Sequence, residues 1–272
     1  MIAVIGGSGF IGQEICKVLM KKNLQHFSLS SDVMNLLCAN SVGELSDKLN
    51  HSDVIIFCSA LAPCKDVKMF RENVQMVENF ISHVKKDKRL IYLSSDAVYD
   101  DTMSRITEDS DCRPTSIHGL MHITREYLLK SHFTDLAIVR PTLVYGFGDP
   151  HNGYGPNRFM RQAIKGEVLS IFGQGEELRD HIHVSYVAEL IYLIVQKKCR
   201  GVFNAVSGHE ITFKEIAQSV IKFTNSKSEI KSIQRTGGMP HNGIRIFDNA
   251  KVKSYFSEIH APTFLEGLAN YQ

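Results

Sequence analysis

The stretch Met-Ile-Ala-Val-Ile-Gly-Gly-Ser-Gly-Phe-Ile-Gly, residues 1–12, decides the fold of this 272-residue chain. Its apolar part, residues 2–5, has the length and composition of a strand, and it runs through glycines into the helix-like residues 13–19. The order strand, glycine turn, helix is typical of a loop that holds a dinucleotide pyrophosphate. A glycine turn that binds nothing is the alternative, and the flanking strand and helix disfavour it.

The glycines of this turn have separate expected roles. Gly6 makes the tight turn, Gly9 lets the backbone approach a pyrophosphate, and Gly12 lets the helix pack closely on the strand. The helix N-terminus adds unpaired N–H groups and the positive end of its dipole. The residues expected to bind the cofactor here are Gly6, Ser8, Gly9, Phe10, Ile11 and Gly12.

Length and charge restrict the class of protein. A chain of this size buries roughly three quarters of its unfolded surface, which suits one large α/β domain with or without a smaller lobe. The net charge is +2 and the charges are interspersed, so we expect neither nucleic-acid nor membrane binding. The first strand begins at Ile2, which leaves no basic signal segment, and the apolar runs are shorter than a membrane span. We therefore expect a cytoplasmic protein.

The cysteines fit the same compartment. Six are present and none forms a C-x-x-C pair. Cys16 and Cys58 fall inside a predicted helix and a predicted strand. Buried free thiols in a reducing compartment are the simplest interpretation.

Strands and helices alternate along most of the chain. The predicted strands after the first cover residues 26–30, 53–58, 89–93, 136–140 and 202–206. The predicted helices cover residues 67–86, part of 114–130, 157–165, 186–196, a helix to 223 opened by a Thr212/Glu215 capping box, and two short helices within 252–271. This alternation predicts an α/β fold, a doubly wound parallel sheet with right-handed crossovers.

A polar group after the second strand is expected to meet the adenosine ribose. Asp32 lies at about the right distance and would accept hydrogen bonds from the ribose hydroxyls of NAD. Ser30 and Ser31 could instead tolerate the 2′-phosphate of NADP. No arginine stands nearby to hold such a phosphate, so the residues favour NAD over NADP.

Several further motifs resemble one family. They are residues 94–99 (Ser-Ser-Asp-Ala-Val-Tyr), 140–146 (Arg-Pro-Thr-Leu-Val-Tyr-Gly), 171–175 (Ile-Phe-Gly-Gln-Gly), 179–184 (Arg-Asp-His-Ile-His-Val) and 245–248 (Arg-Ile-Phe-Asp). With the glycine turn, they resemble the NAD-dependent epimerase/dehydratase family, the extended short-chain dehydrogenase/reductases. The resemblance implies a Rossmann domain over residues 1–145 and a small substrate lobe over 146–272, with residues 180–206 returning to the first sheet. It also implies a nucleotide-sugar substrate.

The resemblance places the chemistry on a serine, a tyrosine and a lysine. Ser95 matches the serine, but His118 stands at the tyrosine position and His122 at the lysine position. A histidine titrates near neutral pH, so His118 could exchange a proton with a substrate hydroxyl while hydride moves to or from the nicotinamide. His122, four residues along the same helical face, could donate to the nicotinamide ribose.

Three hypotheses remain for this histidine pair. The first is an active oxidoreductase or epimerase with His118 as acid/base. The second is a degenerate family member that binds NAD(P) and a ligand without redox turnover. The third is a metal site, since His118 and His122, or His181 and His183, share a face, but no carboxylate stands at ligand spacing. We therefore predict no metal.

The resemblance also implies further contacts. It assigns Ser59, Ala60, His122 and Pro141 to the cofactor, and Asp96, Asn157, Arg179 and Arg245 to the substrate. The two arginines would hold its diphosphate, a role that suits guanidinium groups. Dehydration is the reaction least expected, because Ala97 replaces the glutamate that acts beside the aspartate in dehydratases. A homodimer through the helix around His118 is expected from the resemblance alone.

Overall fold

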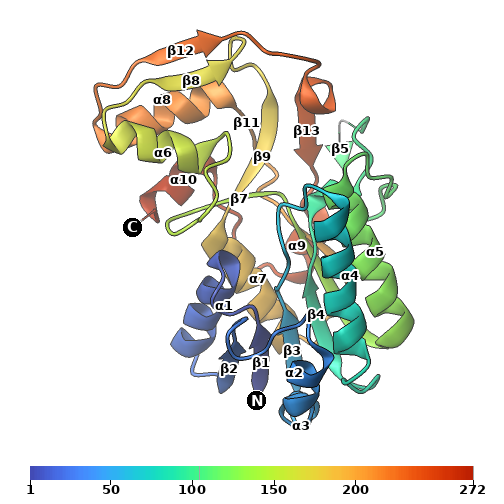
Figure 1. Ribbon diagram of the computed structural model, residues 1–272. Helices are drawn as coiled ribbons and strands as arrows, with labels where there is room; N and C mark the ends of the chain where they lie inside the picture. The colour runs from blue at the N-terminus through green and yellow to red at the C-terminus, as the bar shows by residue number, and fades with distance from the viewer. Residues whose placement is uncertain (104, 272) are drawn as a thin grey trace. The chain divides into compact units, whose positions relative to one another are not determined.

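The computed structural model of the protein describes residues 1–103 and 105–271 (Figure 1). By its contacts the chain divides into two compact units. Unit 1 comprises residues 1–100, 108–141 and 187–205, and unit 2 comprises residues 101–107, 142–186 and 206–272. The chain thus changes unit after Pro141 rather than after the expected residue 145, and residues 101–107 join unit 2.

Unit 1 is built on a parallel sheet of six strands within the described residues. Its strands are β1 (Ile2–Ile5), β2 (His26–Leu29), β3 (Val54–Phe57), β4 (Arg89–Leu93), β6 (Asp135–Pro141) and β10 (Gly201–Ala205). Their order is β10-β6-β4-β3-β1-β2, and every neighbouring pair is parallel. The strand order reverses at β1, which confirms the predicted doubly wound α/β fold.

The helices of unit 1 cover both faces of this sheet. They are α1 (Phe10–Lys21), α2 (Ala39–Glu44), α3 (Ser46–Asn50), α4 (Val67–Ile81), the 3₁₀ turn η1 (Asp96–Val98), α5 (Ile117–His132) and most of α7 (Val184–Gln196). Figure 1 shows α4 and α5 side by side on one face, with α1 and α7 on the other. Covered on both faces, the central strands β1, β3 and β4 are buried along their whole length.

The helix α4 ends earlier than predicted. It stops at Ile81, whereas the apolar spacing predicts a helix as far as residue 86. The Ser82 hydroxyl donates to the carbonyl of Glu78, and the His83 ring lies 2.8 Å from the carbonyl of Asn79. These side chains satisfy carbonyls of the last turn, so the helix can end there.

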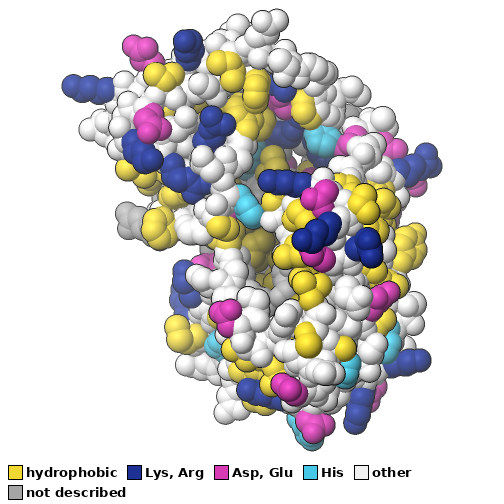
Figure 2. Space-filling view, in the orientation of Figure 1, with side chains coloured by type: hydrophobic (Ala, Val, Ile, Leu, Met, Phe, Trp, Pro, Cys, Tyr) yellow, Lys and Arg dark blue, Asp and Glu magenta, His cyan; other side chains and the backbone are white. Residues whose placement is uncertain are grey.

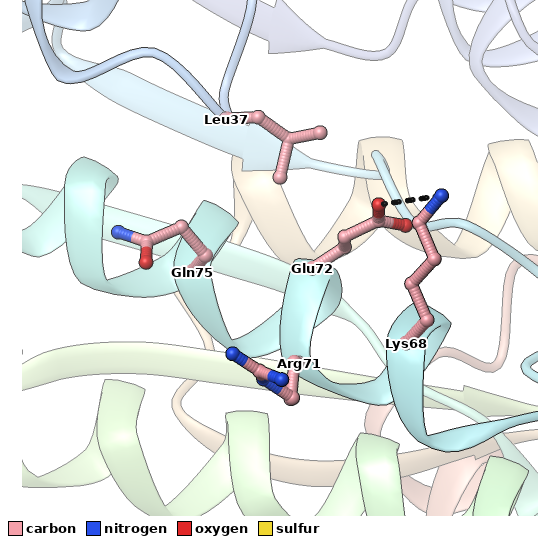
Figure 3. Close-up of a pocket in the computed structure, with 5 residues that line it drawn as sticks. All are labelled: Leu37, Lys68, Arg71, Glu72 and Gln75. Atoms are coloured by element: carbon pink, nitrogen blue, oxygen red, sulfur yellow. Dashed lines mark ion pairs between the residues drawn. The ribbon is translucent and has the colours of Figure 1, made fainter.

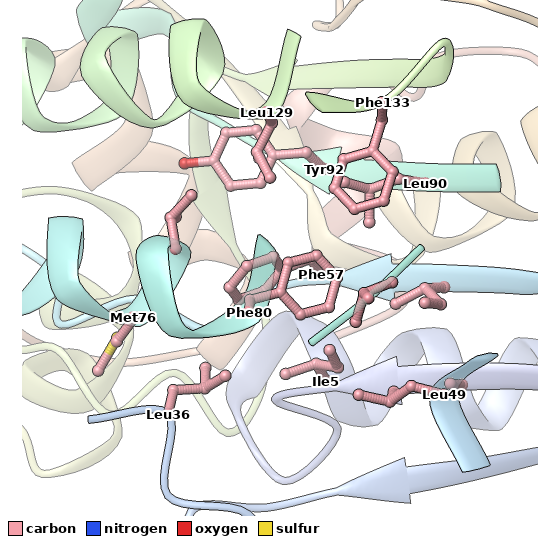
Figure 4. Packing of buried hydrophobic residues seen from close by; sticks show 14 of the residues in the cluster. Ile5, Leu36, Leu49, Phe57, Met76, Phe80, Leu90, Tyr92, Leu129 and Phe133 are labelled. Carbon is pink, nitrogen blue, oxygen red and sulfur yellow. The ribbon is translucent and has the colours of Figure 1, made fainter. Parts of the chain in front are cut away.

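An aromatic cluster fills the core between the sheet and α4 and α5 (Figure 4). The ring centroids of Phe57 and Phe80 are 4.8 Å apart, and those of Phe57 and Tyr92 are 6.1 Å apart. Phe133 at the end of α5 joins the cluster 5.7 Å from Phe80. Tilted and edge-on rings at these separations are the favoured arrangements. This cluster fixes α5, which carries the histidine pair, against β4.

The described residues of unit 2 form two smaller sheets. Its strands are β5 (Arg105–Ile106), β7 (Leu143–Tyr145), β8 (Leu169–Phe172), β9 (Leu178–His183), β11 (Glu210–Thr212), β12 (Ile230–Ile233) and β13 (Ile244–Phe247). The order β11-β9-β13-β5 forms one sheet, β7 pairs with β9, and β8 pairs with β12. Its helical elements are α6 (Pro156–Ile164), α8 (Phe213–Thr224), η2 (Pro240–Gly243), α9 (Ala250–Tyr255) and α10 (Phe264–Ala269). The predicted Thr212/Glu215 capping box opens α8.

The surface carries charged side chains of both signs. Basic and acidic side chains are interspersed over the face seen in Figure 2. No helix within the described residues is long and apolar enough to cross a membrane.

The six cysteines are free, but Cys38 is exposed and Cys16 only half-buried, so the prediction of buried thiols is too broad. Cys58 lies just beyond β3 rather than inside it, because Phe57 makes the last ladder pair.

Candidate active site in unit 1

The carboxyl ends of the parallel strands bring most of the predicted cofactor residues to one edge of unit 1. The glycine turn follows β1, Ser30 follows β2, Ser59 follows β3, Ser95 follows β4 and Pro141 ends β6. Ligands of doubly wound sheets bind at this edge, where the strand order reverses. The topology therefore assembles the predicted set from segments far apart in sequence.

The glycine turn requires glycine at two positions for steric reasons. Gly6 has φ +86°, and a Cβ there would lie 2.9 Å from the backbone nitrogen of Ser59. A Cβ at Gly12 would lie 2.1 Å from the carbonyl oxygen of Gly6. Real side chains do not tolerate such contacts with backbone, so α1 can approach the turn this closely only with glycine at residue 12.

The N-terminus of α1 is open to a ligand. Gly9 is the N-cap residue and supplies no side-chain cap, so the N–H groups of the first turn have no side-chain acceptor among the described residues. Gly9 and Ser8 are exposed, and the nearest atom to a Cβ on Gly9 would be the carbonyl oxygen of Gly6 at 3.3 Å. This cradle fits a pyrophosphate, because N–H groups and the dipole end attract an anion.

The expected ribose residues follow β2 in a turn. The carbonyl of Ser30 accepts from the backbone N–H groups of Val33 and Met34, which holds the turn. Asp32 is exposed on it, and Ser30 is half-buried. An exposed carboxylate beside the strand end can accept hydrogen bonds from ribose hydroxyls, as the sequence predicts.

Side chains of α4 and α5 hold the turn after β3. The Asn73 side chain on α4 bonds both the N–H and the carbonyl of Leu61, each at 3.0 Å. The Arg125 guanidinium on α5 donates to the carbonyl of Ser59 at 2.7 Å. Ser59 and Ala60 are half-buried at the strand edge. Two helices therefore fix the backbone of this predicted cofactor turn.

The histidine pair lies on the first turns of α5. Ser116 caps this helix by accepting from the Gly119 N–H at 3.0 Å. A Cβ on Gly119 would lie 1.9 Å from the carbonyl of Ala97, so the glycine lets α5 sit directly against η1. The rings of His118 and His122 are edge to face, with centroids 4.8 Å apart. Their i, i+4 spacing thus brings them into contact, as predicted.

His118 has a defined hydrogen-bond state. Its Nδ1 accepts from the backbone N–H of Cys64 at 3.2 Å. Burial lowers the pKa of His118, and the nearby Asp96 carboxylate opposes that shift only in part. The ring is therefore neutral at pH 7, with Nδ1 as the acceptor and the proton on Nε2.

His122 is more deeply buried than His118. It is 4% exposed, and its Nδ1 lies 2.9 Å from the hydroxyl of Tyr92. Burial holds its pKa well below the usual range, and the charge of Arg125, or of His118 when that ring is protonated, acts in the same direction. The His122 ring is therefore neutral at pH 7.

Ser95 and Asp96 lie at the end of β4, beside α5. Ser95 Oγ accepts from the Ala97 N–H at 3.2 Å and lies 3.4 Å from Asp96 Oδ1. Both residues are half-buried. The structure therefore brings Ser95, Asp96 and His118 to the same end of unit 1.

Sequence reasoning missed the phenol of this site. Tyr92 on β4 is fully buried and meets His122, whereas Tyr99 donates to Asn204 Oδ1 and Tyr127 is exposed on the surface. No periodicity distinguishes Tyr92 from the other buried positions of its strand. Only the packing of β4 on α5 reveals the contact.

A buried ion-pair network centres on Glu126, one helical turn after His122 on α5. Arg140 on β6 donates twice to the Glu126 carboxylate, at 2.9 and 2.6 Å, and Ser94 donates to it at 2.7 Å. Burial tends to raise the pKa of Glu126, but hydrogen bonds and charge from Arg140, with the Ser94 bond, outweigh it and hold the pKa below its usual range. Lys130 approaches the same carboxylate from the surface at 3.2 Å. The network ties β4, β6 and α5 together.

A surface groove of about 320 Å³ lies elsewhere on unit 1 (Figure 3). It is lined by Leu37, Lys68, Arg71, Glu72 and Gln75, and Lys68 pairs with Glu72 at 3.8 Å. None of the predicted site residues is among them. The groove is separate from the histidine pair and the glycine turn.

In unit 2 the two predicted substrate arginines are neighbours. Arg179 on β9 and Arg245 on β13 are directly paired in the parallel ladder. Both are buried: Arg179 donates to Glu177 at 2.6 Å, and Arg245 lies 3.3 Å from Asp101. Arg235 also pairs with Glu177. The two arginines are thus neighbours, but each guanidinium already has an acceptor within unit 2.

Asn157 has a role inside its own loop. Its Oδ1 accepts from the Gly146 N–H at 3.1 Å and from the Tyr271 hydroxyl at 3.0 Å, and its Nδ2 donates to Asp149 at 2.7 Å. These bonds close the loop of residues 146–155. The predicted contact of Asn157 with substrate would have to replace one of them.

The histidines of β9 do not assemble a metal site. His181 is buried in unit 2 and His183 lies 2.8 Å from the Ser185 hydroxyl. Across residues 1–103 and 105–271, no three His, Cys, Asp or Glu side chains are grouped as a metal ion would require.

The buried His181 is expected to make the folded state less stable at acidic pH. Burial and the charge of Arg179 lower its pKa to about 3, although the Arg179 backbone opposes this. The unfolded chain takes up a proton below about pH 6.5 and the folded ring does not, so stability is complete above that pH and falls below it. Between pH 7 and pH 5, we expect the free energy of unfolding measured with urea to fall by about 2 kcal/mol less in His181→Phe than in wild type. Equal losses in the two proteins would contradict this prediction.

Comparison with known proteins agrees with this architecture. The UDP-N-acetyl-alpha-D-glucosaminuronate decarboxylase of Bacillus cytotoxicus is 25% identical over 275 residues, covering 88% of this chain and 84% of that protein. The structure of Thermus thermophilus UDP-glucose 4-epimerase in complex with NAD superposes with a TM-score of 0.86 at 20% identity, over 99% and 97% of the two chains. A dTDP-4-dehydrorhamnose reductase from Bacillus anthracis, in complex with NADP, gives 0.81 at 16% identity, over 99% and 97%.

The family itself follows from the sequence match. The pattern of the NAD dependent epimerase/dehydratase family matches residues 2–205, which include every strand of the unit 1 sheet. The chain belongs to the NAD dependent epimerase/dehydratase family.

Proposed function

We propose that the protein is an NAD(P)-dependent oxidoreductase or epimerase acting on a nucleotide sugar, with His118 in the proton-handling position. The observation that carries this proposal is the placement of His118 beside Asp96, at the strand edge that also holds the glycine turn. The family and its relatives, which include an epimerase, a decarboxylase and a reductase of nucleotide sugars, support the substrate class.

The glycine turn would hold the pyrophosphate of the cofactor, and Asp32 with Ser30 its adenosine ribose. When bound, the nicotinamide would accept or return a hydride. Relatives are complexes with NAD and with NADP, which supports a cofactor of this class. The exposed Asp32 favours NAD, because a 2′-phosphate beside a carboxylate is repelled.

Gly9→Leu tests the cofactor site. Gly9 has φ −75°, and a side chain there extends past the carbonyl of Gly6 into open space, so the variant is expected to fold. Its side chain would occupy the space of the pyrophosphate, and we expect binding of NAD(H) and NADP(H) in calorimetry to be lost. Gly153→Leu is the control, because nothing lies within 4 Å of a Cβ at that glycine. Wild-type affinity in Gly9→Leu would refute the assignment.

The hydrogen bonds of His118 restrict what it can do. With Nδ1 accepting from Cys64, the neutral ring offers Nε2–H as a donor. Such a donor can hydrogen-bond the oxygen of a sugar carbonyl, and the alkoxide that a hydride would leave there would take its proton from solvent. Taking a proton from a substrate hydroxyl at Nε2 would require the other tautomer and loss of the Cys64 bond. The geometry therefore supports the reducing direction most directly.

A binding protein without turnover is the second candidate. The buried, neutral state of His122 favours it, because the site then lacks a cation at the position where the family has lysine. The engaged arginines of unit 2 point the same way. A screen of nucleotide sugars with cofactor, followed by product analysis, separates the two candidates.

A further inference from the structure

Arg125 is a buried cation with no carboxylate partner among the residues the structure describes. Its side chain is 0% exposed. Its Nη1 donates to Asn73 Oδ1 at 3.2 Å and its Nη2 to the Ser59 carbonyl at 2.7 Å, while Nε has no acceptor. An uncompensated buried charge is costly to folding, and such groups are concentrated at functional sites. Arg125 therefore calls for a role beyond packing.

The guanidinium lies against two aromatic rings. Its carbon is 5.0 Å from the ring centroid of Phe57 and 5.3 Å from that of Tyr92. A cation over the face of a phenol withdraws electron density and strengthens the O–H as a donor. Burial nevertheless raises the pKa of Tyr92 to about 12, with Arg125 opposing and Glu126 adding to the shift. Tyr92 thus keeps its proton at neutral pH and is poised to donate it in a hydrogen bond.

The direction of the Tyr92–His122 hydrogen bond follows from its surroundings. The hydroxyl and His122 Nδ1 are 2.9 Å apart, and the described residues offer the hydroxyl no other acceptor. If Nδ1 carried the proton, the buried O–H of Tyr92 would be left unpaired, which native proteins avoid. Tyr92 therefore donates, Nδ1 accepts, and the proton of the neutral His122 ring is on Nε2.

We propose that Arg125 and Tyr92 are positioning residues that fix His122 as the neutral Nε2–H tautomer. The purpose of this tautomer, to offer Nε2–H as a donor to the cofactor ribose, rests on the proposed function. The tautomer itself does not. The same guanidinium holds the Ser59 backbone, so it couples the turn after β3 to the orientation of His122. At position 122, where the family has a lysine, this chain has a neutral histidine. The cation is instead Arg125, about one helical turn further along α5.

Nitrogen NMR of histidine-labelled protein tests this tautomer directly, without cofactor or substrate. In wild type at pH 7.5 we expect His122 as Nε2–H, with an unprotonated Nδ1. In Tyr92→Phe the ring remains against Arg125 but the donor is gone, so the Nδ1 signal should shift toward the protonated form. In Arg125→Met the charge is removed at similar length, and His122 should titrate at higher pH than in wild type.

The control variant is Phe57→Leu, which disturbs the same packing without changing the phenol or the cation, and it should keep the wild-type tautomer. Calorimetry with NAD(H) adds a separate readout, in which we expect Tyr92→Phe to weaken cofactor binding about fivefold. Wild-type His122 found as Nδ1–H or as the imidazolium would overturn the inference, even if neither variant folds. An unchanged tautomer in folded Tyr92→Phe would also overturn it. A correct tautomer in a wild-type protein that binds no cofactor would refute the proposed function alone.

Discussion

His118→Ala is expected to lower turnover of an identified nucleotide sugar by roughly 10²- to 10⁴-fold, with cofactor affinity nearly intact. The neutral ring lies beside Asp96 and offers Nε2–H, so its removal takes away the donor that the proposed function places at the reacting oxygen. The cofactor contacts expected at the glycine turn lie on other elements. The measurement is kcat and KM with the purified variant, together with calorimetry of NAD(H) binding.

The matched variant His118→Gln separates two roles for this side chain. Glutamine keeps an N–H donor of similar reach but does not titrate. If His118 polarises a carbonyl as a neutral donor, the glutamine variant should retain clearly more activity than the alanine variant. If it exchanges the proton as acid/base, both variants should lose activity alike. Full activity in His118→Ala would refute any role for His118 in the reaction.

Glu126→Ala is expected to destabilise unit 1 by about 3–5 kcal/mol, the cost typical of leaving one partner of a buried ion pair alone. The change strands the Arg140 guanidinium, which donates two hydrogen bonds to this carboxylate, and it leaves the Ser94 hydroxyl without its acceptor. Both charged groups are buried. Chemical denaturation followed by circular dichroism measures the loss as a lower midpoint.

Lys130→Ala is the control for that experiment. Lys130 pairs with the same carboxylate from an exposed position, so its removal should cost no more than about 1 kcal/mol. A double change, Glu126→Leu with Arg140→Met, should recover much of the loss, since apolar replacements of buried pairs are often neutral. If Glu126→Ala costs as little as Lys130→Ala, the network is not important for stability.

The central strands of unit 1 were predictable because their sequence signals are local. Residues 89–93 form an unbroken apolar run after the first residue, and the structure has β4 over that span. Thr212 and Glu215 form a capping box that depends on three residues of spacing, and it opens α8 as predicted. The short strands β5 and β11 could not be found in this way. They have two and three residues, and their pairing with β13 and β9 is decided by contacts distant in sequence.

The candidate site divides along the same line. The glycine turn follows from spacing, and so does the prediction that His118 and His122 stand at the tyrosine and lysine positions of the family. The state of those histidines cannot, because it depends on Cys64 and Tyr92, which other elements bring to α5. Arg125 shows no sequence signal either: only its burial without a carboxylate partner among the described residues distinguishes it from an ordinary helix-surface arginine.

The most direct test of the central claim is turnover by the wild-type protein. We would incubate it with nucleotide sugars and NAD(H) or NADP(H), follow the absorbance of the reduced nicotinamide, and separate products by chromatography with mass detection. We expect, for at least one nucleotide sugar, either net change in the cofactor with an oxidised or reduced sugar, or an unchanged cofactor with a new stereoisomer. Calorimetric binding of both cofactor and nucleotide sugar, with neither product formed, would contradict it and identify a binding protein.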